Sequence, residues 1–329
     1  MADHPILVTG AAGFIGFHLT QRLLAEGRRV IGIDNINAYY DPKLKEARLD
    51  ILKPQPGFTF HKLDLVDRDG IKALFSAHRF PAVVHLAAQA GVRYSLENPH
   101  AYVDANLEGF INVLEGCRHH GCEHLLFASS SSVYGANAVP PFAETQTVDQ
   151  PLSLYAASKA SNELMAHSYA HLYRIPCTGL RFFTVYGAWG RPDMAPLIFS
   201  RAILAGRPIE VFNRGRMRRD FTYIDDIVAG VIGALGVPPK DDGKHAPIAI
   251  YNLGNHRPVE LERFIAVIEL AAGRKAERIN KPMQAGDMTE TSAAVDRAHA
   301  AFGFAPATTI EQGMPKVVAW CREYFGDKL

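Results

Sequence analysis

The sequence has little net charge, few cysteines and no long hydrophobic run, and each shortage excludes a class of protein. Its 35 Lys and Arg residues nearly balance 34 Asp and Glu residues, so no overall field favours nucleic acid or an anionic membrane. No apolar run approaches the length of a membrane span, and the first residues lack the basic and apolar regions of a signal peptide. We therefore expect a cytoplasmic enzyme without nucleic-acid or membrane partners.

Cysteine is scarce, and its spacing matches neither a disulfide framework nor a common metal site. Cys117 and Cys122 stand in the segment CRHHGCEH, where cysteine and histidine crowd together. Their C-x4-C spacing, with a helix expected before Gly121 and a buried strand after it, favours core packing over zinc. Cys177 and Cys321 stand alone, so we expect reduced thiols and no bound metal.

Short apolar runs alternate with helical patterns through the first half of the sequence. This alternation predicts a parallel sheet covered by helices on both faces, which is a Rossmann-type doubly wound α/β fold. Between the runs lie helix-like stretches, among them FIGFHLTQRLLAEG and the long segment Pro99–His119. The runs expected to be strands are ILVTG (6–10), RVIGID (29–34), AVVHLAA (82–88), HLLFASS (124–130) and CTGLRFF (177–183).

The pattern becomes irregular after the last of these runs, where Arg, Pro and Gly are frequent. We therefore expect two units, a larger Rossmann domain and a smaller C-terminal α/β domain that binds the substrate. The larger unit is predicted at residues 1–183 with about 219–254, and the smaller one at about 184–218 with 255–329. The segment GVPPKDDGKHAP, residues 236–247, is predicted to be a surface loop.

The first expected strand leads into the glycine-rich turn TGAAGFIG, which contains Gly10, Gly13 and Gly16. Glycines at such a turn let backbone N–H groups approach a pyrophosphate at the N-terminus of the next helix. The motif also precedes Asp34, which stands at the end of the next expected strand. A carboxylate there accepts hydrogen bonds from the adenosine ribose and repels a 2′-phosphate, so we predict NAD rather than NADP, bound by the larger unit.

In the segment SLYAASKAS, Tyr155 and Lys159 are four residues apart and share one face of an expected helix. A phenol with a pKa near ~10 is a poor base at neutral pH, but an adjacent ammonium and a positive nicotinamide ring both favour the phenolate. Lowering the pKa to about 7 requires about 4 kcal/mol of differential stabilisation. We predict that Tyr155 takes a proton from a sugar hydroxyl while a hydride leaves the same carbon for NAD.

Six motifs occur in order along essentially the whole chain: TGAAGFIG, HLAAQAGVRYS, FASSSSVYG, YAASK, LRFFTVYG and RRDFTYIDDI. The sequence thereby resembles the extended short-chain dehydrogenases/reductases, and among them the sugar-nucleotide epimerase branch. The longer strings NAYYDPKLKEARL, RYSLENP, TVYGAWGRPDM and YNLGNHRPVEL are similar to those of UDP-glucuronate 4-epimerases. The resemblance implies NAD-dependent interconversion of UDP-glucuronate and UDP-galacturonate, by transient oxidation at C4, rotation of the 4-keto sugar and return of the hydride to its opposite face.

The resemblance also implies roles for the residues at matching positions. Tyr155 is the expected base, Lys159 its pKa partner and a ribose ligand, and Ser130 a hydrogen-bond partner of the oxygen at C4. Asn106 is expected near the nicotinamide ribose, and Asp64 is either an adenine contact or a helix cap. The other expected cofactor contacts, besides the three glycines and Asp34, are Phe14, Ile15, Asn35, Asn37, Leu65, Leu86, Ala87, Ala88, Gln89, Ser129, Phe182 and Val185.

For a UDP-hexuronic acid substrate, the resemblance implies a second set of contacts. Arg219 matches a diphosphate-binding arginine, and Val211 with Phe212 matches a strand that contacts uracil. Asp287 matches a nucleotide-side acid, whereas Gln284 stands where glucose-type epimerases place an arginine. The expected contacts of the sugar and its carboxylate are Arg93, Ser130, Ser131, Ser132, Tyr155, Thr184 and Arg191.

The run FASSSSVYG is also informative for the acids that it lacks. Related 4,6-dehydratases carry an Asp-Glu pair where this chain has Ser131 and Ser132, and hydroxyls cannot serve as acid or base near neutral pH. UDP-glucuronate decarboxylases place a glutamate nearby, and that glutamate is missing too. We therefore expect epimerisation. A UDP-glucose/UDP-galactose 4-epimerase, a UDP-glucuronate decarboxylase and a non-catalytic NAD-binding protein stay open as alternatives.

The chain is also predicted to form a homodimer. Two expected helices, Pro99–His119 and Tyr155–Tyr173, carry apolar faces, and two such helices from each subunit can pack as a four-helix bundle with two-fold symmetry. Burial inside the subunit is the alternative for some of these side chains. The apolar residues concerned are Val103, Leu107, Phe110, Leu164, Tyr169 and Leu172.

Overall fold

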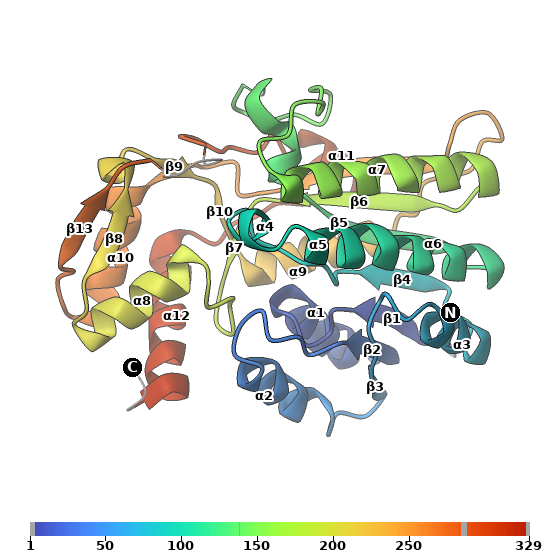
Figure 1. Cartoon of the computed structure of the whole chain (residues 1–329), viewed down its shortest axis with the longest axis horizontal. Helices are drawn as coiled ribbons and strands as arrows, with labels where there is room; N and C mark the ends of the chain where they lie inside the picture. Colours follow the sequence, from blue (N-terminus) through green and yellow to red (C-terminus); the bar gives the residue numbers. More distant parts are fainter. Residues whose placement is uncertain (1–3, 138, 284–287, 327–329) are drawn as a thin grey trace.

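The computed structural model describes residues 4–137, 139–283 and 288–326. At its centre lies a parallel sheet with the strand order β11-β6-β5-β4-β1-β2-β3 (Figure 1). The predicted α/β fold with a doubly wound parallel sheet is confirmed, and each of the predicted runs contains a strand. The strands are β1 (Ile6–Thr9), β2 (Val30–Asp34), β3 (Phe58–Lys62), β4 (Ala82–His85), β5 (His124–Ser130), β6 (Cys177–Phe182) and β11 (Ile248–Leu253).

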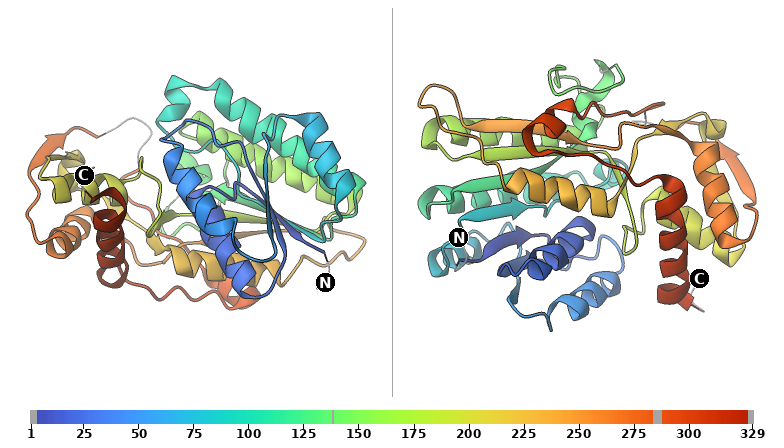
Figure 2. Two further views of the ribbon diagram at one scale, coloured as in Figure 1. Left: turned by 90° about the horizontal axis from the view of Figure 1, so that it is seen from below. Right: turned by 180° about the vertical axis from the view of Figure 1, so that it is seen from behind.

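The strands are apolar on both sides because helices cover both faces of the sheet. Leu7 of β1 packs in a buried cluster with Phe110, whereas its neighbour Val8 packs in another cluster with Leu19. Figure 1 and the view from behind in Figure 2 show the two helical layers. One layer contains α3 (Arg68–Ala77), α6 (Gly109–His119) and α7 (Leu154–Tyr173); the other contains α1 (Phe14–Ala25), α9 (Ile224–Leu235) and α11 (Asp296–Phe302).

The segment Pro99–His119, predicted as one helix, is divided into α5 (His100–Tyr102), the π-helix η1 (Val103–Glu108) and α6. The single-helix prediction is therefore wrong in this part. A π-helix lengthens the backbone hydrogen-bond ring by one residue, and such turns are frequent at functional sites. Here the carbonyl of Asn106 accepts a hydrogen bond from Nδ2 of Asn162 at 2.6 Å, which joins η1 to α7.

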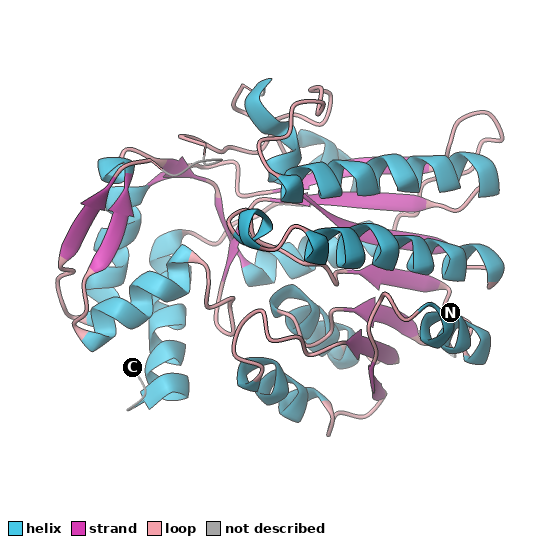
Figure 3. Cartoon of the chain, viewed as in Figure 1, coloured by secondary structure: helices cyan, strands magenta, loops and turns pink. Residues whose placement is uncertain are grey.

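A second group of elements stands on the left in Figure 1, beside the sheet. Ile265 and Val317 of this group belong to the same buried cluster as Val8 of β1, so the two groups share a continuous core. The colouring by element in Figure 3 shows that the second group is mostly helical, with one short parallel pair of strands, β8 and β13. Its elements are α8 (Ala195–Ala205), β8 (Ile209–Phe212), α10 (Leu261–Ala272), β13 (Arg278–Lys281) and α12 (Ile310–Phe325).

Short elements complete the described chain and join the two groups. β7 (Thr184–Tyr186), which directly follows β6, pairs in parallel with β10 (Phe221–Tyr223), and β9 (Arg218–Arg219) pairs antiparallel with β12 (Val259–Glu260). The remaining elements are α2 (Lys43–Leu52), α4 (Tyr94–Glu97) and the 3-10 helices η2 (Ser131–Asn137) and η3 (Asn213–Gly215).

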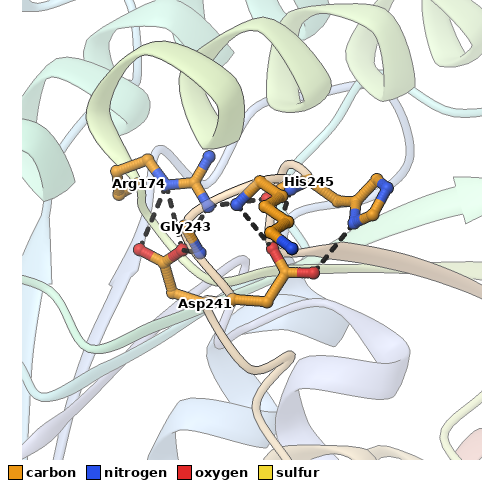
Figure 4. A network of polar contacts seen from close by, with 6 residues as sticks. Arg174, Asp241, Gly243 and His245 are labelled. Atoms are coloured by element: carbon orange, nitrogen blue, oxygen red, sulfur yellow. Dashed lines mark hydrogen bonds and ion pairs between the residues drawn. The ribbon is translucent and has the colours of Figure 1, made fainter.

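Residues 236–247 form a loop between α9 and β11 that is fastened to the end of α7 (Figure 4). Arg174, directly after α7, donates from Nε to Oδ2 of Asp241 at 3.0 Å and from Nη2 to the carbonyl of His245 at 2.6 Å. Asp242 accepts a hydrogen bond from the His245 N–H at 2.7 Å. These groups are largely exposed, and ion pairs in water contribute little to stability, so the network shapes the loop more than it stabilises the fold.

Cys117, Cys122, Cys177 and Cys321 are all buried as free thiols. Cys117 and Cys177 lie in the buried cluster between the sheet and α6, which accounts for them as packing residues. Within the described ranges, no group of three or more His, Cys, Asp or Glu side chains is placed to hold a metal ion. In the same part of the chain, no helix is long and apolar enough to cross a membrane.

Candidate functional site

A cavity opens where the loops leave the carboxyl ends of the sheet strands, the edge at which parallel α/β sheets bind their ligands. Tyr39, Tyr40, Lys45 and Met194 line it, and the sequence analysis predicted none of them. The predicted cofactor residues that line it are Gly10, Gly13, Phe14, Ile15, Gly16, Asp34, Asn35, Asn37, Asp64, Leu65, Leu86, Ala87, Ala88, Gln89, Ser129, Tyr155, Lys159, Phe182 and Val185.

The turn after β1 folds tightly because its glycines leave no room for side chains. Gly10 has a left-handed φ of 71°, and its carbonyl accepts a hydrogen bond from the Gly13 N–H at 2.9 Å. A Cβ on Gly16 would lie 2.1 Å from that carbonyl oxygen, so only glycine fits. α1 starts at Phe14 without a side-chain cap, which leaves backbone N–H groups of its first turn available to an anion such as a pyrophosphate.

Asp34 ends β2 and lines the cavity with its carboxylate held in place by the chain itself. Its Oδ1 accepts a hydrogen bond from the Ile36 N–H at 2.8 Å and lies 3.3 Å from Nζ of Lys45. Lys45 is a buried residue of α2 that also donates to Oδ1 of Asn37 at 3.0 Å. The acid predicted to bind the ribose therefore has a cation beside it, which the sequence motif did not indicate.

Two further residues predicted at the cofactor differ in their placement. Asp64 accepts a hydrogen bond from Nδ2 of Asn35 at 2.9 Å, and both side chains line the cavity. Asn106 is buried behind the wall: its Oδ1 accepts from the Gln89 N–H at 2.8 Å, and its Nδ2 donates to the Gln89 carbonyl at 3.0 Å and to Oγ of Ser158 at 2.9 Å. Both amide N–H groups of Asn106 are thus used within the chain, where they fix the segment after β4 against α7, and Asn106 does not itself line the cavity.

Ser130, Tyr155 and Lys159 come together on the cavity wall at the end of β5. Ser153 caps α7 by accepting a hydrogen bond from a backbone N–H of its first turn at 3.1 Å, which starts the helix just before the tyrosine. Nζ of Lys159 donates to the carbonyl of Ala128 at 3.0 Å, so the ammonium is tied to β5 close to the serine. The predicted base, its cation and its serine thus share one corner of the site.

Burial controls the protonation of this corner. Burial raises the pKa of Tyr155, while a hydrogen bond with Ser130 and the charge of Arg191 act in the opposite direction. Burial also lowers the pKa of Lys159 to about 8. The charge of Lys159 is not among the causes that shift the pKa of Tyr155, so the predicted lowering of this pKa by Lys159 is not a property of the chain alone. A phenolate at neutral pH needs further positive charge, such as that of a nicotinamide ring.

Behind the serine run lies a buried ion pair that the sequence analysis missed. Arg181 of β6 donates to both carboxylate oxygens of Glu163 on α7, from Nε at 2.9 Å and from Nη2 at 2.7 Å. Oγ of Ser129 donates to the same carboxylate at 2.5 Å, and the guanidinium lies 4.7 Å from the centre of the Tyr134 ring. These contacts fix β5, β6 and α7 to one another behind the corner that holds Ser130, Tyr155 and Lys159.

The end of the cavity predicted to hold the sugar is built from loops. Arg191 is half-buried and donates to Asp193 from Nε at 3.1 Å and from Nη2 at 2.5 Å, and the hydroxyl of Tyr39 donates to Asp193 at 2.9 Å. Burial raises the pKa of Tyr39 to about 12. Gly91, with φ 101°, allows this contact, because a Cβ there would lie 2.5 Å from the Tyr39 hydroxyl. The predicted sugar contacts that line the cavity are Ser130, Ser131, Ser132, Tyr155, Thr184 and Arg191.

Of the described residues predicted for the nucleotide part of the substrate, none lines the cavity, and neither does Arg93, which was predicted to contact the sugar. The guanidinium of Arg93 lies 5.2 Å from the centre of the Phe212 ring, so these two side chains meet. Val211 is buried in the core, which leaves only its backbone for a ligand. Nη1 of Arg219 donates to the carbonyl of Arg218 at 3.2 Å. The other two predicted contacts, Gln284 and Asp287, lie outside the described residues.

A Rossmann-type sheet with a glycine turn, and a Ser, Tyr and Lys in one corner of the same cavity, define an NAD-dependent enzyme of the short-chain dehydrogenase/reductase class. More narrowly, residues 6–254 match the NAD dependent epimerase/dehydratase family, and the chain belongs to this family. A probable UDP-glucuronate 4-epimerase of Rhizobium meliloti (strain 1021) is 49% identical to it over 326 residues, which cover 95% of this chain and 96% of the relative.

Two solved structures show the same fold over nearly the whole chain. The UDP-glucuronic acid 4-epimerase of Bacillus cereus, in complex with UDP-glucuronic acid and NAD, gives a TM-score of 0.89 at 31% identity and covers 97% of this chain and 99% of its own. The UDP-glucose 4-epimerase of Thermotoga maritima, with UDP-glucose, gives a TM-score of 0.88 at 28% identity and covers 98% and 99% of the two chains.

The residues of the cavity fit NAD, the cofactor of this family. The glycine turn offers a close backbone approach that a Cβ would fill, and the uncapped start of α1 suits the pyrophosphate. The carboxylate of Asp34 suits the adenosine ribose, and Lys159 stands near Tyr155 for the nicotinamide side. These residues would hold the cofactor along the carboxyl edge of the sheet.

Proposed function

We propose that this protein is a UDP-glucuronate 4-epimerase, which interconverts UDP-glucuronate and UDP-galacturonate. The observation that carries the proposal is the set of groups around Tyr155: Arg191 brings a cation, and Ser131, Ser132 and Thr184 bring hydroxyls to the same wall. A uronate differs from a neutral hexose by its carboxylate, which a guanidinium and hydroxyl donors bind well. The names of the Rhizobium meliloti relative and the Bacillus cereus structure support this substrate.

In this proposal Tyr155 takes the proton of the C4 hydroxyl and gives it back after the sugar has turned over. Ser130 holds the C4 oxygen by a hydrogen bond, and Lys159 favours the phenolate by its charge. A bound NAD would supply the redox chemistry, as the acceptor and later the donor of the hydride of C4. The sugar presents its opposite face for the return while the rest of the substrate stays bound, so the configuration at C4 is inverted.

The carboxylates of the site support epimerisation over elimination. Among the described residues that line the cavity, the only carboxylates are those of Asp34 and Asp64, and both belong to the adenosine end. The positions where dehydratases of similar sequence carry acids are Ser131 and Ser132. No carboxylic acid is therefore placed near Tyr155 in the described wall to remove a proton from C5 or to protonate a leaving hydroxyl.

A panel of UDP-sugars tests the proposal. The protein is incubated with NAD and with UDP-glucuronate, UDP-galacturonate, UDP-glucose or UDP-galactose in turn, and the products are separated by chromatography. We expect the two uronates to interconvert with no net change in NAD. Turnover of the neutral sugars alone would favour a UDP-glucose 4-epimerase, the activity in the name of the Thermotoga maritima structure. Loss of carbon dioxide would favour a UDP-glucuronate decarboxylase. Absence of turnover with all four sugars would favour a non-catalytic NAD-binding protein.

We also propose that the protein is a cytoplasmic homodimer with the two units predicted from the sequence. The side chains of Val103, Leu164 and Leu172 are 43%, 73% and 62% exposed, on η1 and α7, which pack side by side. Such an apolar face suits a two-fold helix bundle, whereas Phe110 is buried inside the subunit and does not contribute. Light scattering at micromolar concentration tests this: Leu164→Glu with Leu172→Glu should give the mass of a monomer, and a monomeric parent would contradict it.

A further inference from the structure

Arg48 of α2 is a buried cation to which the reaction assigns no role. Its side chain is fully buried, and its Nε has no hydrogen-bond partner among the described residues. Its other donors go to neutral oxygens: Nη1 to the carbonyl of Ala12 at 2.8 Å and the hydroxyl of Tyr40 at 2.9 Å, Nη2 to the carbonyls of Trp189 at 2.6 Å and Gly190 at 3.1 Å. A buried guanidinium without an acid is costly, so its presence needs a reason.

The oxygens that Arg48 binds join two parts of the site that are far apart in the sequence. Ala12 lies inside the glycine turn, between Gly10 and Gly13. Trp189 and the residue after it lie in the first part of the loop between β7 and α8, residues 187–191, which we call the loop 187–191 and whose last residue is Arg191. A single side chain therefore bridges the turn suited to the cofactor's pyrophosphate and the loop suited to the substrate's carboxylate.

The same loop has a second anchor in the first half of the chain. The ring of His18 on α1 forms a hydrogen bond with the carbonyl of Ala188 at 2.9 Å. Burial lowers the pKa of His18 to about 4, so the ring is neutral and Nε2–H is the donor. Three successive carbonyls of the loop are thus held by side chains from α1, which directly follows the glycine turn, and from α2.

The loop needs such anchors because its backbone is strained. Trp189 has a left-handed φ of 59°, which is unfavourable for a bulky residue. Its indole packs 5.2 Å from Trp320 of α12 and 5.7 Å from Phe17 of α1, measured between ring centres. The conformation that delivers Arg191 to the cavity is therefore imposed by contacts from three helices.

We propose that Arg48 is a positioning residue that ties the glycine turn to the loop 187–191 and so sets the place of Arg191 once NAD is bound. The two negative charges of a pyrophosphate at the turn attract the guanidinium, which has no acid of its own to neutralise it. That attraction draws Arg48 toward the glycine turn, and the hydrogen bonds of Arg48 then hold the loop 187–191 more firmly against the turn. The effect on the uronate rests on the proposed function; the link between turn and loop does not.

The fluorescence of Trp189 tests the link directly. The chain has two tryptophans, so Trp320→Phe leaves Trp189 as the reporter of the loop. Acrylamide quenching is measured with and without NAD in this background. We expect NAD to lower the quenching constant by about two-fold in the parent, and to leave it unchanged in Arg48→Met and Arg48→Lys. Lysine keeps the charge but cannot bridge both segments, so it decides the test if the methionine variant does not fold.

Lys43→Met is the matched control. Lys43 is a cation on the same helix, but it is exposed and does not line the cavity. Protection of Trp189 by NAD should therefore persist in this variant. Equal protection in Arg48→Lys and the parent, or its equal loss in Lys43→Met, would overturn the link.

A double-mutant cycle tests the effect on the sugar side. Arg48→Lys should lower kcat/KM for UDP-glucuronate by about ten-fold in the parent, but by no more than about two-fold in the Arg191→Met background. Equal losses in both backgrounds would show that Arg48 acts independently of Arg191 and would refute this half of the proposal. If the parent does not turn over UDP-glucuronate, the proposed function fails instead, and the quenching experiment still decides the link.

Discussion

The two ends of the cavity are built in different ways. At the cofactor end the groups follow directly on sheet strands: Gly10 on β1 and Asp34 at the end of β2. At the sugar end the groups belong to loops, and side-chain contacts such as those of Arg191 with Asp193 and of Tyr39 with Asp193 hold them. At the cofactor end, binding depends mainly on groups whose position is fixed by the sheet strands. At the sugar end, binding depends on side chains that hold one another in position.

This difference predicts different kinds of damage. A backbone site is lost when one added atom blocks the approach, because no neighbouring side chain can replace an N–H group. A side-chain site tolerates substitutions without loss of the fold, but its selectivity changes with each donor that is removed. The corner with Tyr155 lies between the two and should lose turnover while both ligands still bind.

The largest effect is expected at the glycine turn. Gly16→Ala places a Cβ 2.1 Å from the Gly10 carbonyl, so the turn must open and NAD binding should be lost. Titration with NAD, followed by protein fluorescence, measures this. Gly236→Ala is the control, since that glycine has a helical φ of −75° and its Cβ would meet nothing closer than 3.4 Å. NAD affinity close to the parent's in Gly16→Ala would contradict the account of the turn.

The next largest effect is expected at the shared corner. Tyr155→Phe removes the base but keeps a ring that packs beside Tyr102, whose ring centre lies 6.1 Å away. Turnover should fall by at least about 10²-fold, as is usual when a general base is lost, while NAD affinity stays nearly unchanged. Steady-state rates and NAD titration measure the two quantities separately. A rate within a few-fold of the parent's would rule out this role for Tyr155.

At the sugar end we expect a change of product rather than a loss of binding. Once C4 is oxidised, the C5 carboxylate is β to a ketone and can leave as carbon dioxide, and hydroxyl donors that keep it solvated oppose this. A hydrogen bond to a charged acceptor is worth about 1.5–3 kcal/mol, so losing one should shift the partition between epimerisation and decarboxylation by about ten-fold or more. Thr184 lines this part of the wall beside Ser131 and Ser132.

Thr184→Val tests this partition because valine has nearly the same shape without the hydroxyl. We expect measurable UDP-4-keto-pentose and a rise in NADH absorbance, with carbon dioxide released in proportion. A variant that epimerises slowly but releases no more carbon dioxide than the parent would show that Thr184 has another role. We assign Arg191 to substrate binding only. Its charge neutralises the carboxylate, whereas its contact tilts the carboxylate, and these two effects change the rate of decarboxylation in opposite directions.

The same contrast explains how far the sequence could predict the site. Strands, the glycine turn and Asp34 are marked by local patterns, since periodicity and spacing along a few residues determine them. Arg48 could not be found in this way, because its partner Trp189 is 141 residues further on and only the folded loop brings them together. The partners of Asn106 could not be predicted for a related reason: its amide is hydrogen-bonded to Gln89 and Ser158, which the motif alone does not reveal.

The smallest effect is expected for Lys45, whose side chain lies at the cofactor end of the cavity. Lys45→Met removes the cation beside Asp34, but the Ile36 N–H still orients the carboxylate at 2.8 Å. NAD affinity should change by no more than about three-fold, because the ribose hydroxyls still meet the same acceptor. Affinity for NADP should fall by about five-fold, or about 1 kcal/mol, because the cation that partly offsets the repulsion of a 2′-phosphate is gone.

Titrations with NAD and NADP, followed by protein fluorescence, measure the two affinities of this variant. Lys43→Met is the control, since Lys43 is an exposed residue of the same helix and should alter neither affinity. A rise in NADP affinity on removing Lys45 would mean that the lysine serves Asp34 alone and does not act on the phosphate. The expected fall would instead show that Asp34 excludes NADP against the pull of its own neighbour, so that the preference for NAD depends on one carboxylate.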